Sequence, residues 1–300
     1  MLIVAGVLLA LAGPVGSIEV ARTATTATRD AFSVSLGGAI GNLAAQGAAG
    51  SALRRELARA LDLRDSGATW HTQRDAWVAL ATDTAIAAGT MGKIARDIAL
   101  MAQSEVGEVA ERETAGRGGS TAMPHKRNPV LTMRVIAAVH AVPGMIATVL
   151  AAMPQEHERA LGAWQAELAQ WPDLFIHTVS ASRALAELLT GLEVDAARCR
   201  ANIDRLEGAI FAERLVELFE PMVGKTGAQA SVAALSRRAT DEHRELCELA
   251  LELARADPRL AGCLAAEIEA RFDVDRAAQA SAALVGPLLQ SMNKREQTHD

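Results

Sequence analysis

One long apolar stripe constrains the fold of this chain more than any other feature. Between Asp75 and Glu111, apolar or small side chains recur at steps of three and four residues. The stripe consists of Trp77, Leu80, Thr84, Ala88, Met91, Ala95, Ile98, Ala102, Val106 and Val109, and the opposite face carries Asp83, Lys93, Arg96, Asp97 and Glu108. This spacing predicts a single amphipathic helix that runs from Asp75 to Glu111.

Further helices are predicted towards the C-terminus. One should begin at Asn128–Pro129, because Asn is a good N-cap and Pro is tolerated in the first helical turn. Another should cover residues 155–189, with a kink at Pro172 and a stop at Gly191. Asp195 is expected to cap the next helix, and shorter helices follow it.

The fold class follows from this pattern. There is no alternating strand pattern and no βαβ spacing, so we predict an all-α fold, a bundle of long helices with a small C-terminal helical domain. The predicted domains are an atypical apolar N-terminal segment at 1–16, a central long-helix bundle at 17–222 and a C-terminal helical domain at 223–300. Helices this long expose more apolar stripe than one chain can cover, which favours a homo-oligomer.

Composition excludes several functions. The net charge of -6 argues against a broad basic surface for nucleic acid, although a local cationic pocket remains open. The three cysteines and seven histidines lack metal-ligand spacing, so we expect no metal site. The apolar start, Met1 to Gly13, is too short to span a bilayer and lacks a basic flank, so we expect an altered helix start and no membrane partner.

The segment "GGSTAMPHKRNP", from Gly118 to Pro129, differs from its Ala- and Leu-rich surroundings. Its glycines let the backbone approach a ligand, and Ser120 and Thr121 supply hydroxyl groups. Lys126 and Asn128 stand at the start of the next predicted helix, whose N-terminus adds partial positive charge. The segment therefore predicts a carboxylate or oxyanion site, and a simple polar hinge is the alternative.

The order of residues in this segment resembles the signature loop of the fumarase/aspartase superfamily, which reads G-S-S-x-M-P-x-K-x-N. Here the corresponding residues run from Gly119 to Asn128, and only the second Ser differs, being Thr121. The stretches "WHTQRDAW", "GKIARDIALMAQSEVGEVAE", "QEHERALGAWQAE" and "SVSLGGAIGNLAAQG" are similar to one branch, the 3-carboxy-cis,cis-muconate cycloisomerases. The resemblance runs from about Ser33 to the C-terminal helices.

This resemblance implies a bundle of the fumarase/aspartase type, with the signature loop near residues 112–128. It implies a cofactor-free interconversion of 3-carboxy-cis,cis-muconate and its lactone, in which a proton next to a carboxylate is removed. Ser120 matches the catalytic base. It also implies a cytoplasmic homotetramer that acts on a small di- or tricarboxylate in aromatic compound catabolism, the β-ketoadipate pathway. The implied substrate-binding residues are Thr121, Lys126, Asn128 and Arg159, together with Gln73 in "WHTQRDAW" and His157 in "QEHER".

Two other interpretations stay open. The adenylosuccinate lyase branch shares "MPHKRNP", but it has a Ser and an Arg for a nucleotide phosphate where this chain has Trp164 and Leu168. The chain could also be a non-catalytic truncated scaffold. The family's two N-terminal catalytic segments have no match before Gly37, and Met133 stands where the signature usually has an acid. We therefore expect an N-terminally shortened cycloisomerase, completed by another polypeptide, or a scaffold without activity.

Overall fold

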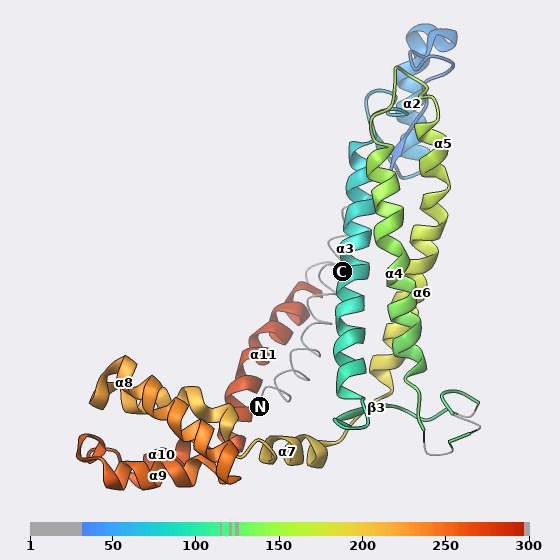
Figure 1. Ribbon diagram of the computed structural model, residues 1–300. Coiled ribbons are helices and arrows are strands. Elements are labelled where there is room, and N and C mark those ends of the chain that lie inside the picture. Colours follow the sequence, from blue (N-terminus) through green and yellow to red (C-terminus); the bar gives the residue numbers. More distant parts are fainter. Residues whose placement is uncertain (1–31, 115, 120–121, 124–125, 297–300) are drawn as a thin grey trace. The chain divides into compact units, whose positions relative to one another are not determined.

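The computed structural model describes residues 32–114, 116–119, 122–123 and 126–296, and helices make up most of this part of the chain (Figure 1). The all-α prediction is confirmed. The chain divides into two compact units. The bundle unit contains the described residues up to Leu100 together with Glu111–Glu193, and the C-terminal unit contains Met101–Ala110 and the described residues from Val194 onward. The predicted segment 1–16 lies outside the described residues, and the predicted domain boundaries stay a prediction.

Three long helices, α3 (Asp75–Met101), α4 (Val130–Ala151) and α6 (Gln170–Thr190), lie side by side in the bundle unit (Figure 1). Gly92 lets α3 approach α4 closely, because a Cβ atom there would lie 2.7 Å from Cγ2 of Val139. The predicted stripe is the buried face of α3: the stripe residues that are buried are Leu80, Thr84, Ala88, Met91, Ala95 and Ile98.

Short elements surround one end of these helices (Figure 1). They are β1 (Ser33–Val34), η1 (Ala44–Ala49), α2 (Gly50–Ala60), β2 (Arg64–Asp65) and α5 (Ala163–Leu168). β1 pairs in parallel with β2, with Ser33 opposite Arg64. The buried Arg54 of α2 donates to Asp65 at 2.6 Å, and this hydrogen bond lowers the pKa of the Asp65 carboxyl.

A buried ion pair lies at the same end of the bundle. Arg74 is 6% exposed and Glu167 is 1% exposed, and Nε of Arg74 donates to Oε2 of Glu167 at 3.1 Å. A second guanidinium nitrogen reaches the other carboxylate oxygen, and Gln155 donates to Oε2 at 3.2 Å. The rings of Trp70 and Trp77 lie 5.4 and 5.7 Å from the guanidinium carbon. Both charges are thus paired out of water, an arrangement that is costly to break from one side.

The predicted helix from Asp75 to Glu111 is too long. α3 ends at Met101, and a turn follows in which the N–H of Gly107 donates to the carbonyl of Gln103 at 2.7 Å. Gly107 has φ of 62°, which a continuing helix cannot contain. The chain then forms β3 (Val109–Glu111), which pairs with β4 (Leu192–Val194).

Glu108 was predicted on the exposed face of that helix, and this is wrong. Glu108 is 0% exposed, and its Oε1 accepts a hydrogen bond from Asn202 Nδ2 at 2.6 Å. The prediction failed because the helix had already ended, so its face no longer determined which way this side chain points.

The predicted helix over 155–189 begins later than predicted and is divided into two helices, α5 and α6. α5 begins at Ala163, and His157, Ala160 and Gly162 before it have φ of 49°, 57° and 89°. Positive φ at these positions interrupts a right-handed helix. Pro172 lies in the first turn of α6, where its missing N–H leaves no hydrogen bond broken.

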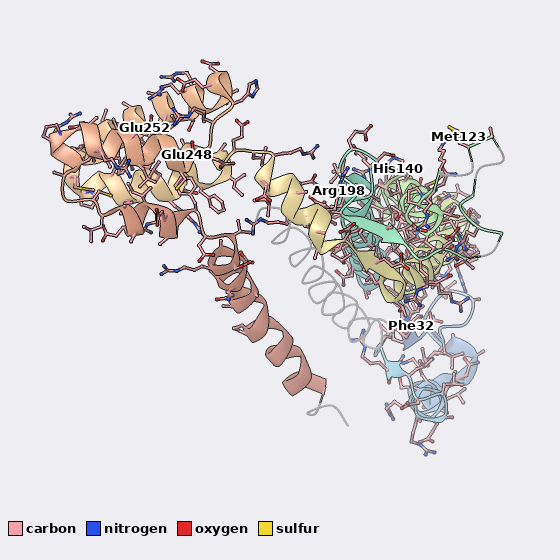
Figure 2. All side chains as sticks on the ribbon, turned by 90° about the horizontal axis from the view of Figure 1, so that it is seen from below. Phe32, Met123, His140, Arg198, Glu248 and Glu252 are labelled. Atoms are coloured by element: carbon pink, nitrogen blue, oxygen red, sulfur yellow. The ribbon has the colours of Figure 1, made fainter. Side chains whose placement is uncertain are left out.

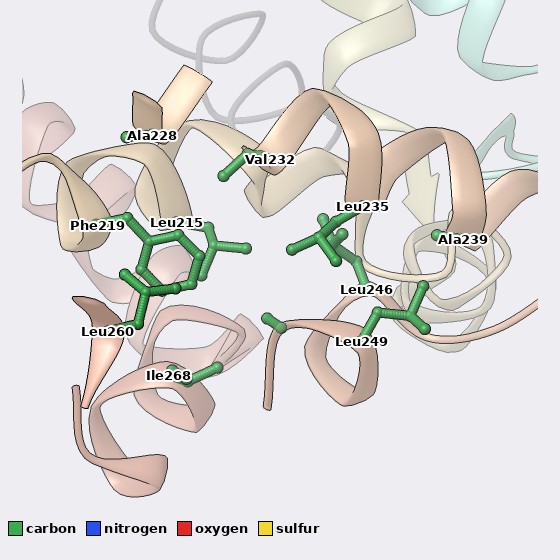
Figure 3. Packing of buried hydrophobic residues seen from close by; sticks show 11 residues of the cluster. Leu215, Phe219, Ala228, Val232, Leu235, Ala239, Leu246, Leu249, Leu260 and Ile268 are labelled. Atoms are coloured by element: carbon green, nitrogen blue, oxygen red, sulfur yellow. The ribbon is translucent and has the colours of Figure 1, made fainter. Parts of the chain in front are cut away.

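The C-terminal unit has its own core (Figure 3). Asp195 caps α7 as predicted, since its carboxylate accepts from the N–H of Arg198 at 2.9 Å. The helices are α7 (Ala196–Asp204), η2 (Ala209–Phe211), α8 (Ala212–Glu242), α9 (Leu246–Ala256), η3 (Pro258–Leu260), α10 (Ala265–Arg271) and α11 (Val274–Glu296). The largest fully buried core side chains are Leu215, Phe219, Leu246, Leu249, Leu260 and Ile268.

α4 is the helix within the described residues that is long and apolar enough to cross a membrane by length and composition. It also packs along α6 over much of its length (Figure 1). Packing in the bundle unit therefore explains part of its apolar composition, because the apolar residues Leu131, Val135, Val139, Val142 and Val149 are buried there.

Candidate functional site

The predicted site residues fall into two groups at opposite ends of the bundle unit. Lys126 and Asn128 precede α4, whereas His157 and Arg159 follow it (Figure 1). The 22 residues of α4 separate the two groups by about 33 Å at 1.5 Å per residue. One copy of the chain therefore does not bring all the predicted residues together. Ser120 and Thr121 lie outside the described residues.

The first group lines a cleft of about 340 Å³. The cleft lies at the loop between β3 and α4, the loop that also carries the exposed Met123, labelled at the edge of the bundle unit in Figure 2. Its lining residues are Glu111, Arg112, Glu113, Arg117, Gly118, Gly119, Lys126, Arg127 and Asn128.

The cleft carries uncompensated positive charge. Arg117 pairs with Glu187 at 2.5 Å, and Arg127 pairs with Glu113 at 3.1 Å. Lys126 is exposed and makes no side-chain ion pair within the described part of the chain. A cleft with a free ammonium group beside backbone and amide donors is suited to a carboxylate ligand.

Asn128 closes the neck of the loop. Its backbone N–H and its Nδ2 both donate to the carbonyl oxygen of Gly118, at 2.9 and 3.1 Å. Gly118 has φ of 82°, and a Cβ atom there would lie 3.0 Å from the carbonyl oxygen of Asn128. This close backbone approach explains the need for glycine at position 118. The side chain of Asn128 therefore holds the loop in addition to any ligand role.

The prediction that Asn128 is the N-cap of α4 is wrong. The N-cap is Pro129, which has no side chain to accept a hydrogen bond. Instead the carboxylate of Glu111, at the end of β3, accepts from the N–H groups of Leu131 at 3.0 Å and Thr132 at 2.8 Å. These two N–H groups of the helix are therefore used internally and are not available to a substrate anion.

His157 and Arg159 of the second group belong to the loop between α4 and α5, at the other end of the bundle unit. Arg159 donates from Nε to the carbonyl of Ala39 at 2.7 Å and from Nη2 to the carbonyl of Gly38. Thr72 donates to the carbonyl of His157 at 2.6 Å. His157 has φ of 49°, so its backbone is held in a costly conformation by these contacts.

Gln73, the remaining predicted residue, is exposed immediately before the buried Arg74 and the start of α3. Gln73 therefore lies near the second group, because its neighbour Thr72 donates to the carbonyl of His157. Trp171 is buried against Trp77, with ring centroids 4.9 Å apart, so it is a packing residue of this end of the bundle.

Sequence reasoning missed the acidic and basic side chains that precede the signature residues, above all Glu111. Because the apolar spacing continues to Val109, the predicted helix ran to Glu111, and the strand that ends at Glu111 was not predicted. Within the described residues there is no group of three or more His, Cys, Asp or Glu side chains that could hold a metal ion.

Comparison with known proteins places this geometry in a family. A family model described as "Lyase" matches residues 17–144. The 3-carboxy-cis,cis-muconate cycloisomerase of Bradyrhizobium diazoefficiens is 40% identical over 268 residues, which cover 89% of this chain and 58% of that protein. The Pseudomonas aeruginosa protein of the same name is 42% identical over 253 residues, covering 84% of this chain and 55% of that protein.

The solved structures include a similar fold. The crystal structure of 3-carboxy-cis,cis-muconate lactonizing enzyme from Pseudomonas putida matches with a TM-score of 0.80 at 32% identity, covering 96% of this chain and 62% of that chain. This chain thus spans less than two thirds of the length of each of these three proteins. The shared sequence and the shared bundle of long helices make this chain similar to lyases of the fumarase/aspartase superfamily.

Proposed function

We propose that this chain supplies part of the active site of a 3-carboxy-cis,cis-muconate cycloisomerase, an enzyme that interconverts a carboxymuconate and its lactone. The observation that carries the proposal is the cationic cleft beside Lys126 and Asn128, in a chain about 40% identical to proteins of that name. The substrate is a small tricarboxylate, and such a ligand requires positive charge and hydrogen-bond donors in a confined space.

In the direction of lactone opening, the proposed chemistry removes the proton next to a carboxylate, which spreads negative charge over that carboxylate group. The ring C–O bond then breaks, and the lactone oxygen leaves as the third carboxylate. Lactonisation is the reverse: that carboxylate oxygen adds to the double bond, and the proton returns to the carbon. Lys126 faces this negative charge as an ammonium group, and fixed donors of this kind contribute most when they are positioned in advance. Asn128 donates in the same region, and Ser120 acts as the base, with Thr121 hydrogen-bonded to the substrate. His157, Arg159 and Gln73 bind the substrate from the other end of a neighbouring copy.

The separation of the two groups supports a homo-oligomer, which we propose is a tetramer located in the cytoplasm. Residues about 33 Å apart in one copy can share a site only if copies pack side by side in opposite directions. The three long helices also present large apolar side chains to solvent in a single copy. The most exposed of these are Ile86 and Leu100 on α3, Met133 and Leu150 on α4, and Ile176 and Val179 on α6.

A charge placed on this apolar face is expected to dissociate the oligomer. Ile176 is 64% exposed in a single copy, so Ile176→Asp costs little in the isolated chain but buries an unpaired carboxylate in the assembly. Leu264, equally exposed at 64% but in the C-terminal unit, provides the matched control Leu264→Asp. Sedimentation velocity should show a tetramer for the wild type and the control, and monomers for Ile176→Asp. A tetramer in all three would place the interface elsewhere.

Activity is tested by complementation, because the chain covers 55% of the Pseudomonas aeruginosa relative. The part of that relative that has no counterpart here is produced as a separate polypeptide and mixed with this chain. Lactonisation of 3-carboxy-cis,cis-muconate is followed by the loss of muconate absorbance. We expect a rate in the mixture well above that of either polypeptide alone. Absence of activity in the mixture, with the intact relative active in the same assay, would argue against the proposed reaction.

A further inference from the structure

Glu111 connects two segments that are far apart in the sequence. It is the last residue of β3, and its half-buried carboxylate reaches the first turn of α4. Oε2 accepts from the N–H of Leu131 at 3.0 Å, and Oε1 accepts from both the N–H and the hydroxyl of Thr132 at 2.8 Å. Thr132 is 0% exposed, so these bonds lie at the base of the helix and not on its surface.

A second set of hydrogen bonds holds the same loop where its two ends meet. The carbonyl of Gly118 accepts both hydrogen bonds from Asn128. The two contacts hold different parts of the loop. The hydrogen bonds of Glu111 join the start of the loop to the first turn of α4, and the Gly118–Asn128 hydrogen bonds join the loop to the residues just before α4. Asn128 makes the second of these contacts, and Lys126 lies two residues before it, inside the loop that the contact closes.

We propose that Glu111 is a positioning residue of the candidate site. It takes the place of a local N-cap for α4 and holds the return of the signature loop, so that Lys126 and Asn128 line the same cleft. This rests on the proposed function in one respect, that the cleft is where the substrate binds.

The charge of Glu111 fits this role. A carboxylate at the wall of an anion-binding cleft would repel the ligand, but here three donors and the positive end of α4 offset its charge. The cleft then attracts anions through its side-chain cations. The neighbouring Glu113 is different: it is 74% exposed and pairs with Arg127, itself 62% exposed.

Hydrogen exchange measured by NMR on the whole chain tests the positioning role. In Glu111→Ala we expect the amide exchange of Leu131 and Thr132 to accelerate at least tenfold, and that of Lys126 and Asn128 to accelerate with it. Thr132→Val, which keeps the shape of the side chain but removes the hydroxyl, should have a smaller effect in the same direction. Glu113→Gln should leave all four amides unchanged.

Binding of tricarballylate, followed by chemical-shift titration, supplies the readout that a purely structural cap would not move. We expect Glu111→Ala to weaken binding about fivefold or more and Glu111→Gln to weaken it less because one oxygen still accepts. Glu56→Gln, at an exposed glutamate of α2 outside the cleft, should leave the affinity unchanged. If only Leu131 and Thr132 exchange faster, with Lys126, Asn128 and tricarballylate affinity as in the wild type, Glu111 is a helix cap and the proposal is wrong.

The two proposals fail in different ways. If the wild-type chain binds no tricarballylate in the cleft, the substrate site proposed above is wrong, and the exchange of Lys126 and Asn128 still decides whether Glu111 positions them. If Glu111→Ala does not fold, Thr132→Val and Glu111→Gln carry the same comparison. Equal acceleration in Glu113→Gln would overturn the proposal, because the effect would then come from any loss of charge in the loop.

Discussion

In the complemented lactonisation assay, Ser120→Ala is expected to lower the turnover rate by about 100- to 10,000-fold, the range contributed by a positioned general base. Ser120 follows Gly119 in the signature loop. We propose that it removes the proton when the lactone opens, and by microscopic reversibility the same group delivers the proton in the lactonisation that is assayed. Its loss should leave the Michaelis constant nearly unchanged, because Lys126 and Asn128 still bind the carboxylate groups. A fall in the turnover rate with little change in the Michaelis constant indicates an interaction made mainly in the transition state.

The control for this prediction is Ser51→Ala. Ser51 is an exposed serine in the first turn of α2, away from the cleft, and its replacement should leave the rate unchanged. If Ser120→Ala retains the wild-type turnover rate while Lys126→Ala is inactive, the cleft binds substrate but the base is another group.

Arg74→Met is expected to reduce the free energy of unfolding of the bundle unit by about 3–5 kcal/mol, the usual cost of removing one partner from a buried ion pair. Glu167 is 1% exposed, so the variant leaves its carboxylate in the interior with Gln155 as the remaining donor. The guanidinium also lies against the rings of Trp70 and Trp77, and those contacts are lost as well. The loss is measured by urea titration.

Tryptophan fluorescence reports this unfolding selectively. All four tryptophans of the chain lie in the bundle unit, so the signal follows that unit and not the C-terminal unit. Arg59→Met is the matched control, because Arg59 and Glu56 form a pair that is 78% and 66% exposed and should contribute about 0.5 kcal/mol or less. The double variant Arg74→Met/Glu167→Leu should recover most of the stability. Equal loss in the double and single variants would show that the aromatic contacts, and not the ion pair, stabilise this end of the bundle.

Much of the fold could be predicted from apolar periodicity, because burial of a stripe along α3 is what stabilises that helix. The ends of helices were harder. Val106 and Val109 continue the stripe in sequence, but Val109 is buried from a strand, and Gly107 between them turns the chain. Period alone does not distinguish these cases. His157 and Ala160 adopt positive φ without being glycine, so residue type gives no warning that the helix cannot pass through them.

The candidate site could be predicted only where its residues are close in sequence. Lys126 and Asn128 were found because the order of residues around them is distinctive. Glu111 was not, because its partners Leu131 and Thr132 are 20 and 21 positions away and only the folded chain brings them together. Arg159 was predicted as an anion ligand, a role that stays a prediction, and its contacts with two backbone carbonyls depend on a turn more than a hundred residues earlier.

The two hydrogen bonds from Asn128 to the carbonyl oxygen of Gly118 have a consequence for how related sequences can diverge. These hydrogen bonds close a small ring of chain between Gly118 and Asn128, and the exposed pair of Arg127 with Glu113 is a further contact between the described part of this ring and the residues before it. The entropy of closing a ring rises only with the logarithm of its length, so each doubling costs about 0.6 kcal/mol. A longer loop between Gly119 and Arg127 would therefore cost the long helices little stability, so limits on change in this segment come from the chemistry of Ser120, Thr121 and Lys126 and not from the fold.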